Sequence, residues 1–177
     1  GDYLPVICAH PTPNMASLAW VQKVAGSLSR NDKHVHSRFL QLATVTPEGR
    51  PSNRTVVFRG FENTDNLSFI TDARSAKVQE IKSSPYAEVA WYFTETREQF
   101  RISGKLSVVG EETEDGALQA LRQSKWQTIS PNARLQFAWP SPSLPRDLSL
   151  PHSHNPPPPP EDAALPTFSL LLLHPES

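Results

Sequence analysis

A series of short segments rich in β-branched and aromatic residues sets the fold class of this chain. Turn sequences such as TPEGR and FENTDN separate them, and turn residues between short apolar runs are typical of antiparallel strands. Consecutive antiparallel strands with few helices predict a mostly β fold of the α+β class, built around a small closed or partly closed β-barrel. The expected strands are residues 37–45, 50–61, 67–71, 86–93, 98–110 and 168–173.

Helical patterns flank these strands. Residues 15–30 carry apolar side chains at helical spacing, and residues 72–84 begin with Asp72 as the expected N-cap. Residues 111–127 begin acidic and end basic, as the helix dipole favours. Residues 132–139 predict one or two further helical turns.

The length of 177 residues predicts one domain. We expect residues 1–14, which are dotted with prolines, to be an irregular extension, and residues 15–177 to form a single domain. Residues 141–165 form a proline-rich insert, because the stretch 140–166 holds ten of the 18 prolines. Such a tract has no means of forming a core, and it either acts as a spacer or binds an aromatic-lined groove.

Composition and charge exclude several classes of protein. The formal net charge of -1 at pH 7 offers no global field that would attract nucleic acid. The single cysteine, Cys8, supports neither a disulfide framework nor a cysteine-rich zinc site, so we expect an intracellular, reducing compartment and not the secretory route. No apolar run reaches the roughly 18 residues that a membrane-spanning helix needs. Two pairs of histidines lie near one another in the sequence, and without a third ligand neither pair predicts a metal site. The pairs are His34 with His36 and His152 with His154.

The strand expected at residues 50–61 raises a question of charge. Its sequence RPSNRTVVFRGF carries Arg50, Arg54 and Arg59 in or beside an apolar run, although arginine is costly to bury without an anion. On a flat strand Arg54 and Arg59 face opposite sides, so both reach one ligand only through a bulge, a strong twist or an edge. These arginines are therefore either solvated beside acidic residues or part of an anion site.

A second group of cations lies at the start of the helix expected at residues 72–84. A helix N-terminus favours anions, yet Arg74 and Lys77 lie there with the Ser75 hydroxyl beside them. This arrangement makes sense if backbone N–H groups hold a phosphate at the helix start and the side chains neutralise it. A surface helix with tolerated charges is the alternative.

Two further stretches suit a planar ligand. Gln99 opens an expected strand, and its amide both donates and accepts hydrogen bonds, which suits the edge of a heterocycle. In KWQTISPNARLQFAW, aromatic side chains adjoin an arginine, and such a pair can stack on a planar ring and bind its anion. Core packing is the alternative for each tryptophan. The residues concerned are Trp126, Ser130, Arg134 and Trp139.

Four segments follow one another in the order of a known family: LATVTPEGRPSNRTVVFRGF, FITDARSAKVQEI, AEVAWYF and TREQFRISGKL. In them the chain resembles the pyridoxamine 5′-phosphate oxidase-like flavoproteins, most of all their cyanobacterial and plant branch of FMN-binding relatives. The resemblance covers roughly residues 15–140 and, weakly, 165–177. It implies an FMN-binding split β-barrel in a homodimer, with FMN between the subunits, in the cytosol or a plastid.

The resemblance also implies particular binding residues. The strand RTVVFR lines FMN, the Ile-Thr pair contacts flavin and phosphate, the helix start holds the phosphate, and a glutamine meets the flavin edge. The implied FMN-binding residues are Arg54, Thr55, Val56, Val57, Phe58, Arg59, Ile70, Thr71, Arg74, Ser75, Lys77 and Gln99. The implied substrate residues are Arg59, Trp126, Ser130 and Arg134.

The chain departs from the oxidases at several of these positions. Arg59 stands where the oxidases have a lysine, and Ala76 where they have an arginine, for which Arg74 can substitute. Trp126 stands where they have a tyrosine. Their C-terminal Trp, Arg and His elements fall beyond Ser177, so we expect the C-terminus of this chain to be truncated.

The activity implied by the resemblance is that of an FMN-dependent oxidoreductase of vitamin B6 metabolism. It would oxidise pyridoxamine or pyridoxine 5′-phosphate to pyridoxal 5′-phosphate, with oxygen as acceptor. No catalytic side chain is assigned, because the cofactor carries the chemistry and the protein orients both rings. The alternatives are an FMN-binding relative with a different reductase, storage or sensing role, and an interaction module that uses the proline-rich tract. Balanced charge disfavours a nucleic-acid-binding barrel.

Overall fold

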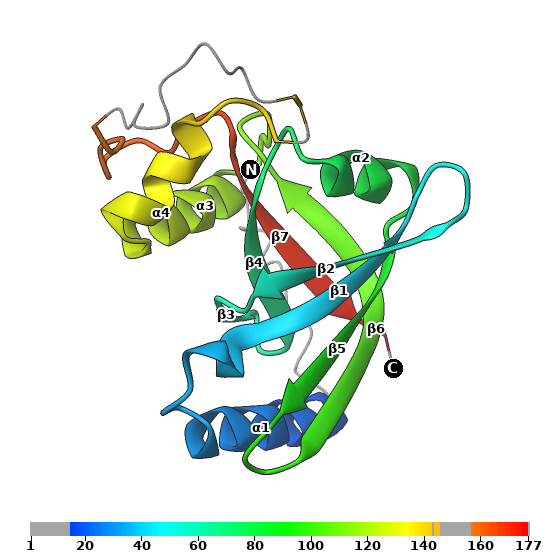
Figure 1. Cartoon of the computed structure of the whole chain (residues 1–177). Coiled ribbons are helices and arrows are strands. Elements are labelled where there is room, and N and C mark those ends of the chain that lie inside the picture. The colour runs from blue at the N-terminus through cyan, green and yellow to red at the C-terminus, as the bar shows by residue number, and fades with distance from the viewer. Residues whose placement is uncertain (1–14, 143, 146–156, 177) are drawn as a thin grey trace, which may run out of the picture.

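The computed structural model describes residues 15–142, 144–145 and 157–176, which form one strongly curled antiparallel sheet with helices at its ends (Figure 1). The strand order is β2-β1-β5-β6-β7-β4-β3. The expected mostly β fold is confirmed. The strands are β1 (Phe39–Val45), β2 (Pro51–Val57), β3 (Gly60–Glu62), β4 (Asn66–Asp72), β5 (Tyr86–Phe93), β6 (Glu98–Val109) and β7 (Phe168–Pro175).

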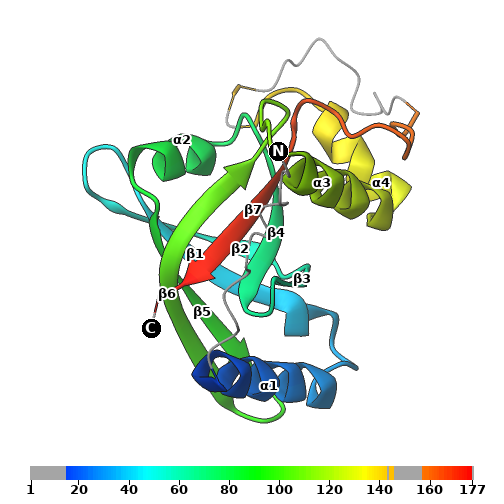
Figure 2. The ribbon, with the colours of Figure 1, turned by 180° about the vertical axis from the view of Figure 1, so that it is seen from behind.

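The helices lie at opposite ends of this sheet (Figures 1 and 2). Helix α1 packs beside the β5–β6 hairpin, whereas α2 lies at the far end, beside the β1–β2 hairpin. Helices α3 and α4 pack together at that same end, on the other side of β7 from α2. None of the helices in the described ranges has both the length and the apolar character that crossing a bilayer requires. The helices are α1 (Met15–Arg30), α2 (Ala76–Ser83), α3 (Gly116–Thr128) and α4 (Pro131–Leu135), with the 3₁₀ turns η1 (Val35–Arg38) and η2 (Gln136–Ala138).

The prediction of one strand over residues 50–61 is wrong, because the chain divides there into β2 and β3. These two strands are the opposite edges of the sheet. At the crossing, the backbone N–H of Phe58 donates to the carbonyl of Arg38 at 2.8 Å, and that of Arg59 donates to Ser68 at 2.9 Å. The crossing thus ties the β1 end of the sheet to β4 and draws the two edges toward each other, which makes the curled sheet a split barrel.

The barrel interior is filled by side chains that alternate along the strands. Leu40 and Leu42 of β1 are at most 1% exposed, while Phe39 and Gln41 between them face outward. Trp91 is fully buried in this core, and its indole N–H donates to the carbonyl of Ser37 at 2.8 Å. The buried apolar face fixes the register, because a shift of one residue would turn every such side chain outward.

Two helices begin later than the sequence predicts. The N-cap of α2 is Ser75, and Asp72, the expected cap, is the last residue of β4. The N-cap of α3 is Asp115, whose carboxylate accepts from the N–H groups of Ala117 and Leu118 at 2.8 and 3.0 Å. The Asp115 carboxylate accepts from two N–H groups that have no partner within the helix, and this capping sets the start of α3. The acidic composition of residues 111–114 does not.

Residues 157–165 of the proline-rich insert pack against α3 and α4, although the tract was not expected to form a core of its own. The carbonyl of Pro159, which is buried, accepts from Arg134 Nε at 3.0 Å, and that of Pro160 accepts from Trp126 Nε1 at 2.9 Å. Ala164 and Leu165 pack on a buried cluster formed by Trp126 and its aromatic neighbours. Side chains of α3 and α4 supply the donors that a proline tract cannot supply itself. The rest of the tract, residues 146–156, and the predicted extension, residues 1–14, lie outside the described residues.

Candidate functional site

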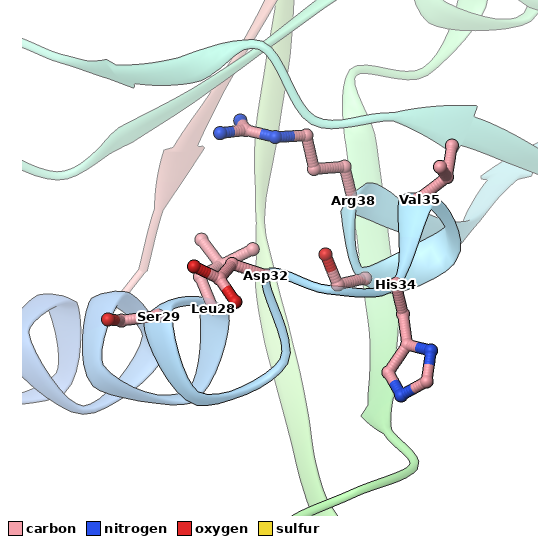
Figure 3. Close-up of a pocket in the computed structure, with 7 residues that line it drawn as sticks. Leu28, Ser29, Asp32, His34, Val35 and Arg38 are labelled. Carbon is pink, nitrogen blue, oxygen red and sulfur yellow. The ribbon is translucent and has the colours of Figure 1, made fainter.

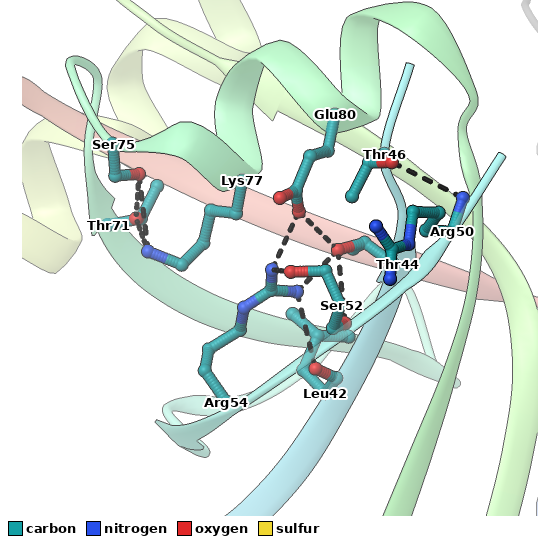
Figure 4. Close-up of polar contacts among 10 residues, drawn as sticks. All are labelled: Leu42, Thr44, Thr46, Arg50, Ser52, Arg54, Thr71, Ser75, Lys77 and Glu80. Carbon is teal, nitrogen blue, oxygen red and sulfur yellow. Dashed lines mark hydrogen bonds and ion pairs between the residues drawn. The ribbon is translucent and has the colours of Figure 1, made fainter. Parts of the chain in front are cut away.

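Three polar side chains form a cradle at the start of α2 (Figure 4). Thr71 lies at the end of β4, Ser75 caps α2 and Lys77 is in its first turn. Lys77 Nζ donates to the Thr71 hydroxyl at 3.0 Å and to the Ser75 hydroxyl at 3.2 Å, and the two hydroxyls are 3.2 Å apart. We call these three residues the cradle.

The electrostatics of the cradle fit a phosphate group. Burial lowers the pKa of Lys77, and the nearby charge of Arg54 lowers it further against the opposing effect of Glu80 and Asp72. The Ser75 hydroxyl makes no capping bond to α2, so it leaves the first N–H groups of the helix to a ligand. A partly buried ammonium, two hydroxyls and a helix N-terminus together suit a dianion.

Arg54 lies beside the cradle but is held by acidic and hydroxyl partners (Figure 4). Its guanidinium forms an ion pair with Glu80 at 2.6 Å and donates to the Ser52 hydroxyl at 2.6 Å and to the Thr44 hydroxyl. Burial acts to raise the pKa of Glu80, but a hydrogen bond from Thr44 at 2.5 Å and the charge of Arg54 outweigh it and hold that pKa below its usual value. Arg54 therefore contributes charge near the cradle while its own hydrogen bonds are satisfied within the chain.

Arg74 does not join the cradle. Its guanidinium pairs with Asp72 at 2.6 Å and donates to the carbonyl of Trp139 at 3.0 Å. The hydrogen bond with Asp72 raises the pKa of Arg74. Because α2 begins at Ala76, Arg74 precedes the helix, and its place in the first turn was wrongly predicted. In this structure it links the end of β4 to the segment after α4.

The residues of the RTVVFR strand divide between two faces of the sheet. Val56 and Phe58 are buried in the barrel core at 7% and 3% exposure, on the same side as Arg54. Thr55 lies on the outer face, and its hydroxyl accepts from the Gln41 amide at 3.1 Å. Val57, the next outer residue of β2, is partly exposed. Thr55 and Val57 are thus available to a ligand on the outer face.

Gln99 lies on the same outer face but at the other end of the sheet. It pairs with Tyr92 across the β5–β6 hairpin and is exposed. That hairpin lies beside α1, whereas the cradle lies at α2 (Figure 1). Within one chain the structure therefore brings Thr71, Ser75 and Lys77 together and leaves Gln99 apart.

The predicted substrate residues on α3 and α4 are mostly engaged inside the subunit. Trp126 is fully buried against Phe137 and Phe168. Arg134 is 7% exposed, and its guanidinium donates to the carbonyls of Pro159 and Ile129 at 3.0 and 2.9 Å. Ser130 is exposed and caps α4. Ile70 also packs between buried clusters. A substrate role for Trp126, Ser130 and Arg134, and a flavin contact for Ile70, stay predictions.

Arg59 lies at the crossing between β2 and β3. Its Nε is buried and has no hydrogen-bond partner in the described part of the chain. Burial, and after it the charge of Arg38, lowers the pKa of Arg59. Sequence reasoning missed Glu80, whose signal is the helical i, i+3 spacing from Lys77. It also missed the charge of Arg38 beside Arg59. No local pattern indicates this neighbour, because the two residues meet only when the sheet closes.

A split barrel of this kind, with a phosphate cradle where a strand leads into a helix, defines a class of FMN-binding split-barrel proteins. The family model for "Pyridoxamine 5′-phosphate oxidase, FMN-binding domain" matches residues 17–110. The chain belongs to this family, and FMN is the cofactor that the domain binds. The resemblance seen in the sequence is thereby confirmed.

Individual relatives agree with this assignment. The chain is 41% identical over 158 residues, covering 89% of this chain and 79% of the relative, to pyridoxine/pyridoxamine 5′-phosphate oxidase 2 of Arabidopsis thaliana. A pyridoxamine 5′-phosphate oxidase-related, FMN binding protein of Nostoc punctiforme superimposes with a TM-score of 0.83 at 49% identity, covering 88% of this chain and 80% of that one. The chain spans 34% to 58% of the length of several bacterial oxidases.

A more distant structure shows the fold alone. PhzG of Burkholderia lata, solved in complex with tetrahydrophenazine-1-carboxylic acid, has a TM-score of 0.71 at 20% identity, covering 99% of this chain and 84% of that one. The ligand of that protein is not a vitamin B6 vitamer. The fold therefore does not by itself define the reaction.

Proposed function

We propose that this chain uses FMN to oxidise pyridoxamine or pyridoxine 5′-phosphate to pyridoxal 5′-phosphate, with oxygen as the electron acceptor. The observation that carries the proposal is the cradle of Thr71, Ser75 and Lys77, which suits the FMN phosphate. The plant relative at 41% identity, which is named as an oxidase of these two vitamers, supports the choice of substrate.

In this proposal the chain's own residues bind and orient. The cradle and the first N–H groups of α2 hold the FMN phosphate, and Arg54 lies beside them in its ion pair with Glu80. Thr55 and Val57 on the outer face of β2 lie along the flavin. Bound FMN supplies the redox chemistry, and the protein raises the rate by holding the two rings in contact and excluding water.

The flavin edge is completed by a second copy of the chain. Gln99 lies far from the cradle within one subunit, so a flavin held at α2 meets a Gln99 only if a partner presents its outer face. Phe39 and Tyr92 leave 42% and 53% of their surface exposed around that face, which is a large aromatic area for a monomer to leave in water. We therefore propose a homodimer with FMN between the subunits.

A second candidate function rests on the burial of Trp126 and Arg134. These side chains are engaged in packing within the subunit, which favours a function that does not need substrate contacts from α3 and α4. An FMN-binding relative with a different reductase role, or with a flavin-storage or sensing role, would not need them.

Turnover separates the two candidates. The FMN-loaded protein should form pyridoxal 5′-phosphate and hydrogen peroxide in equal amounts from either phosphorylated vitamer under air. Pyridoxine and pyridoxamine without phosphate are the matched control substrates and should react far more slowly. Full FMN occupancy with no product from either phosphate would contradict the oxidase proposal and favour the second candidate.

A further inference from the structure

The β5–β6 hairpin extends beyond the rest of the sheet at the end that carries Gln99. Strand β1 pairs with β5 only as far as Ala90, and β7 pairs with β6 only from Gly104 onward. Gln99 and its partner Tyr92 therefore belong to a two-stranded ribbon, which has no third strand in the described part of the chain. A two-stranded hairpin is at best marginally stable by itself in water. The position of Gln99 thus depends on what else holds this ribbon.

Helix α1 supports the ribbon from its inner side (Figures 1 and 2). Val24 of α1 is fully buried in the same core cluster as Trp91 and Phe93 of β5, and Leu28 packs against that cluster. Gln99 lies on the opposite, outer face and is exposed. Helix α1 therefore holds the ribbon without covering Gln99.

One buried polar side chain joins the end of α1 to the turn of the hairpin. Asn31, which is 1% exposed, donates from its amide to the carbonyl of Ser27 at 2.8 Å and to the Thr96 hydroxyl at 3.2 Å. Its side-chain oxygen accepts from the backbone N–H of Glu95 at 3.0 Å. Both ends of the amide are thus engaged, and two of its three partners belong to the turn. Removing such a side chain leaves buried polar groups unsatisfied, which is costly.

Ion pairs at the surface flank Asn31. Arg30 pairs with Glu98 at 2.8 Å, and Lys33 pairs with Glu95 at 3.0 Å. All four side chains are at least 37% exposed, so water and salt screen these pairs. The buried Asn31 is therefore the contact that most firmly fixes the turn to α1.

A pocket of about 360 Å³ lies between the end of α1 and η1 (Figure 3). Leu28 lines it from α1 and Val35 lines it from η1, where Val35 is 83% exposed. Apolar packing therefore does not fix η1 to α1 at this place. His34, the residue before η1, instead contacts the hairpin, with its Nε2 at 2.9 Å from Glu95 Oε1. The turn is the point at which α1, η1 and the hairpin meet.

We propose that Asn31 is a positioning residue for Gln99, which it holds in place by fixing the turn of the β5–β6 hairpin. The inference rests on the proposed function, in which Gln99 completes the flavin edge across a homodimer. Because Asn31 is buried, it acts through the turn and not by contact with the flavin ring. Thr96 precedes Gln99 by three residues, so a displaced turn displaces the Gln99 amide as well.

The test measures binding of FMN and riboflavin together with the visible absorption spectrum of the bound flavin. Gln99→Ala removes a neutral hydrogen bond to the ring, so it should raise the Kd of both flavins by roughly 2- to 12-fold and shift the absorption bands. Asn31→Ala should reproduce this shift and this rise in Kd. The ratio of the two affinities, which the phosphate cradle sets, should stay the same. Lys23→Ala is the matched control, because Lys23 is exposed on the same helix.

A double variant separates positioning from a general loss of stability. If Asn31 acts through Gln99, adding Asn31→Ala to Gln99→Ala should cause no further change in the Kd or the spectrum of either flavin. Thr96→Val, which removes a partner of Asn31 from the turn, is the milder variant if Asn31→Ala does not fold. It should shift the spectrum in the same direction, and Thr96→Ser, which keeps the hydroxyl, should restore it.

Two results would overturn the inference while leaving the shared flavin site standing. One is a wild-type spectrum in Asn31→Ala or Thr96→Val when Gln99→Ala shifts it, and the other is additive losses in the double variant. A Gln99→Ala variant with wild-type spectrum and affinity would overturn both the inference and the proposed flavin edge. The expected spectral changes in a protein that oxidises no vitamer would support the inference and contradict only the oxidase reaction.

Discussion

Replacing Lys77 by alanine should weaken FMN binding strongly while leaving the fold intact. Lys77 Nζ donates to Thr71 and Ser75 at 3.0 and 3.2 Å, and an ammonium has three protons, so one remains for the phosphate. A hydrogen bond to a charged group contributes about 1.5–3 kcal/mol, which corresponds to a roughly 10- to 150-fold rise in Kd. The free energy of unfolding of the FMN-free chain should change by less than about 1 kcal/mol, because desolvation of the ammonium offsets its bonds to the two hydroxyls.

The assay is titration of FMN by the loss of its fluorescence on binding, with chemical denaturation of the FMN-free protein alongside. Lys82→Ala is the matched control, because Lys82 is exposed in the last turn of the same helix. Wild-type FMN affinity in the Lys77→Ala variant would refute the assignment of the cradle to the phosphate.

The same residue predicts a pH dependence. Burial and the charge of Arg54 lower the pKa of Lys77 in the FMN-free chain. Above that lowered pKa, binding of the phosphate requires uptake of a proton, so FMN affinity should begin to fall at a pH below the ordinary lysine value of about 10.4. An affinity that stays constant up to that pH in the wild type would contradict the reasoning.

Further predictions concern stability and assembly. The pKa of Glu80 is depressed in the folded state, so its contribution to stability is present above the ordinary glutamate pKa of about 4.3 and is lost as pH falls toward the folded value. In a plot of unfolding free energy against pH, Glu80→Gln should therefore reduce the slope on the acid side. Trp126→Ala should destabilise the protein by about 3–5 kcal/mol in denaturant unfolding, since the side chain is fully buried, and a variant of wild-type stability would show that Trp126 is not core. Light scattering of the FMN-loaded protein should give twice the 19.7 kDa of one chain, and a fully loaded monomer would contradict the shared site.

The sequence predicts the strands well because the barrel imposes a simple alternation. Along β5 and β6, buried and exposed residues alternate as the pattern of β-branched and aromatic residues indicates. The run FSLLLL has no alternation, and β7 is buried along the same residues because it lies between β6 and β4 in the sheet. The alternation in β5 and β6 and the continuous burial of β7 can both be predicted, because the apolar residues of each strand are the buried ones.

The break at residues 58–59 could not be predicted in the same way. It depends on the closure of the sheet, which brings Arg38 and Ser68 to residues that are distant from them in sequence. The packing of residues 157–165 has the same origin, because its donors are Trp126 and Arg134 on other elements. Local patterns describe faces and turns, whereas these features depend on which elements meet.

The predicted site divides along the same line. Thr71, Ser75 and Lys77 meet because a strand end and a helix start are neighbours in sequence. Arg54 forms an ion pair with Glu80, and Arg74 forms one with Asp72. Only the structure reveals these pairings. A cation counted in a sequence is therefore available to a ligand only where the fold leaves it without an acid.

The most direct test of the FMN assignment compares FMN with riboflavin, which has the same ring system but no phosphate. If the cradle of Thr71, Ser75 and Lys77 holds the phosphate, the wild-type protein should bind FMN at least about 100-fold more tightly than riboflavin, since several charge-assisted bonds of about 1.5–3 kcal/mol are involved. The Lys77→Ala substitution should narrow that ratio by weakening FMN alone. Equal affinity of the wild-type protein for the two flavins would contradict the account.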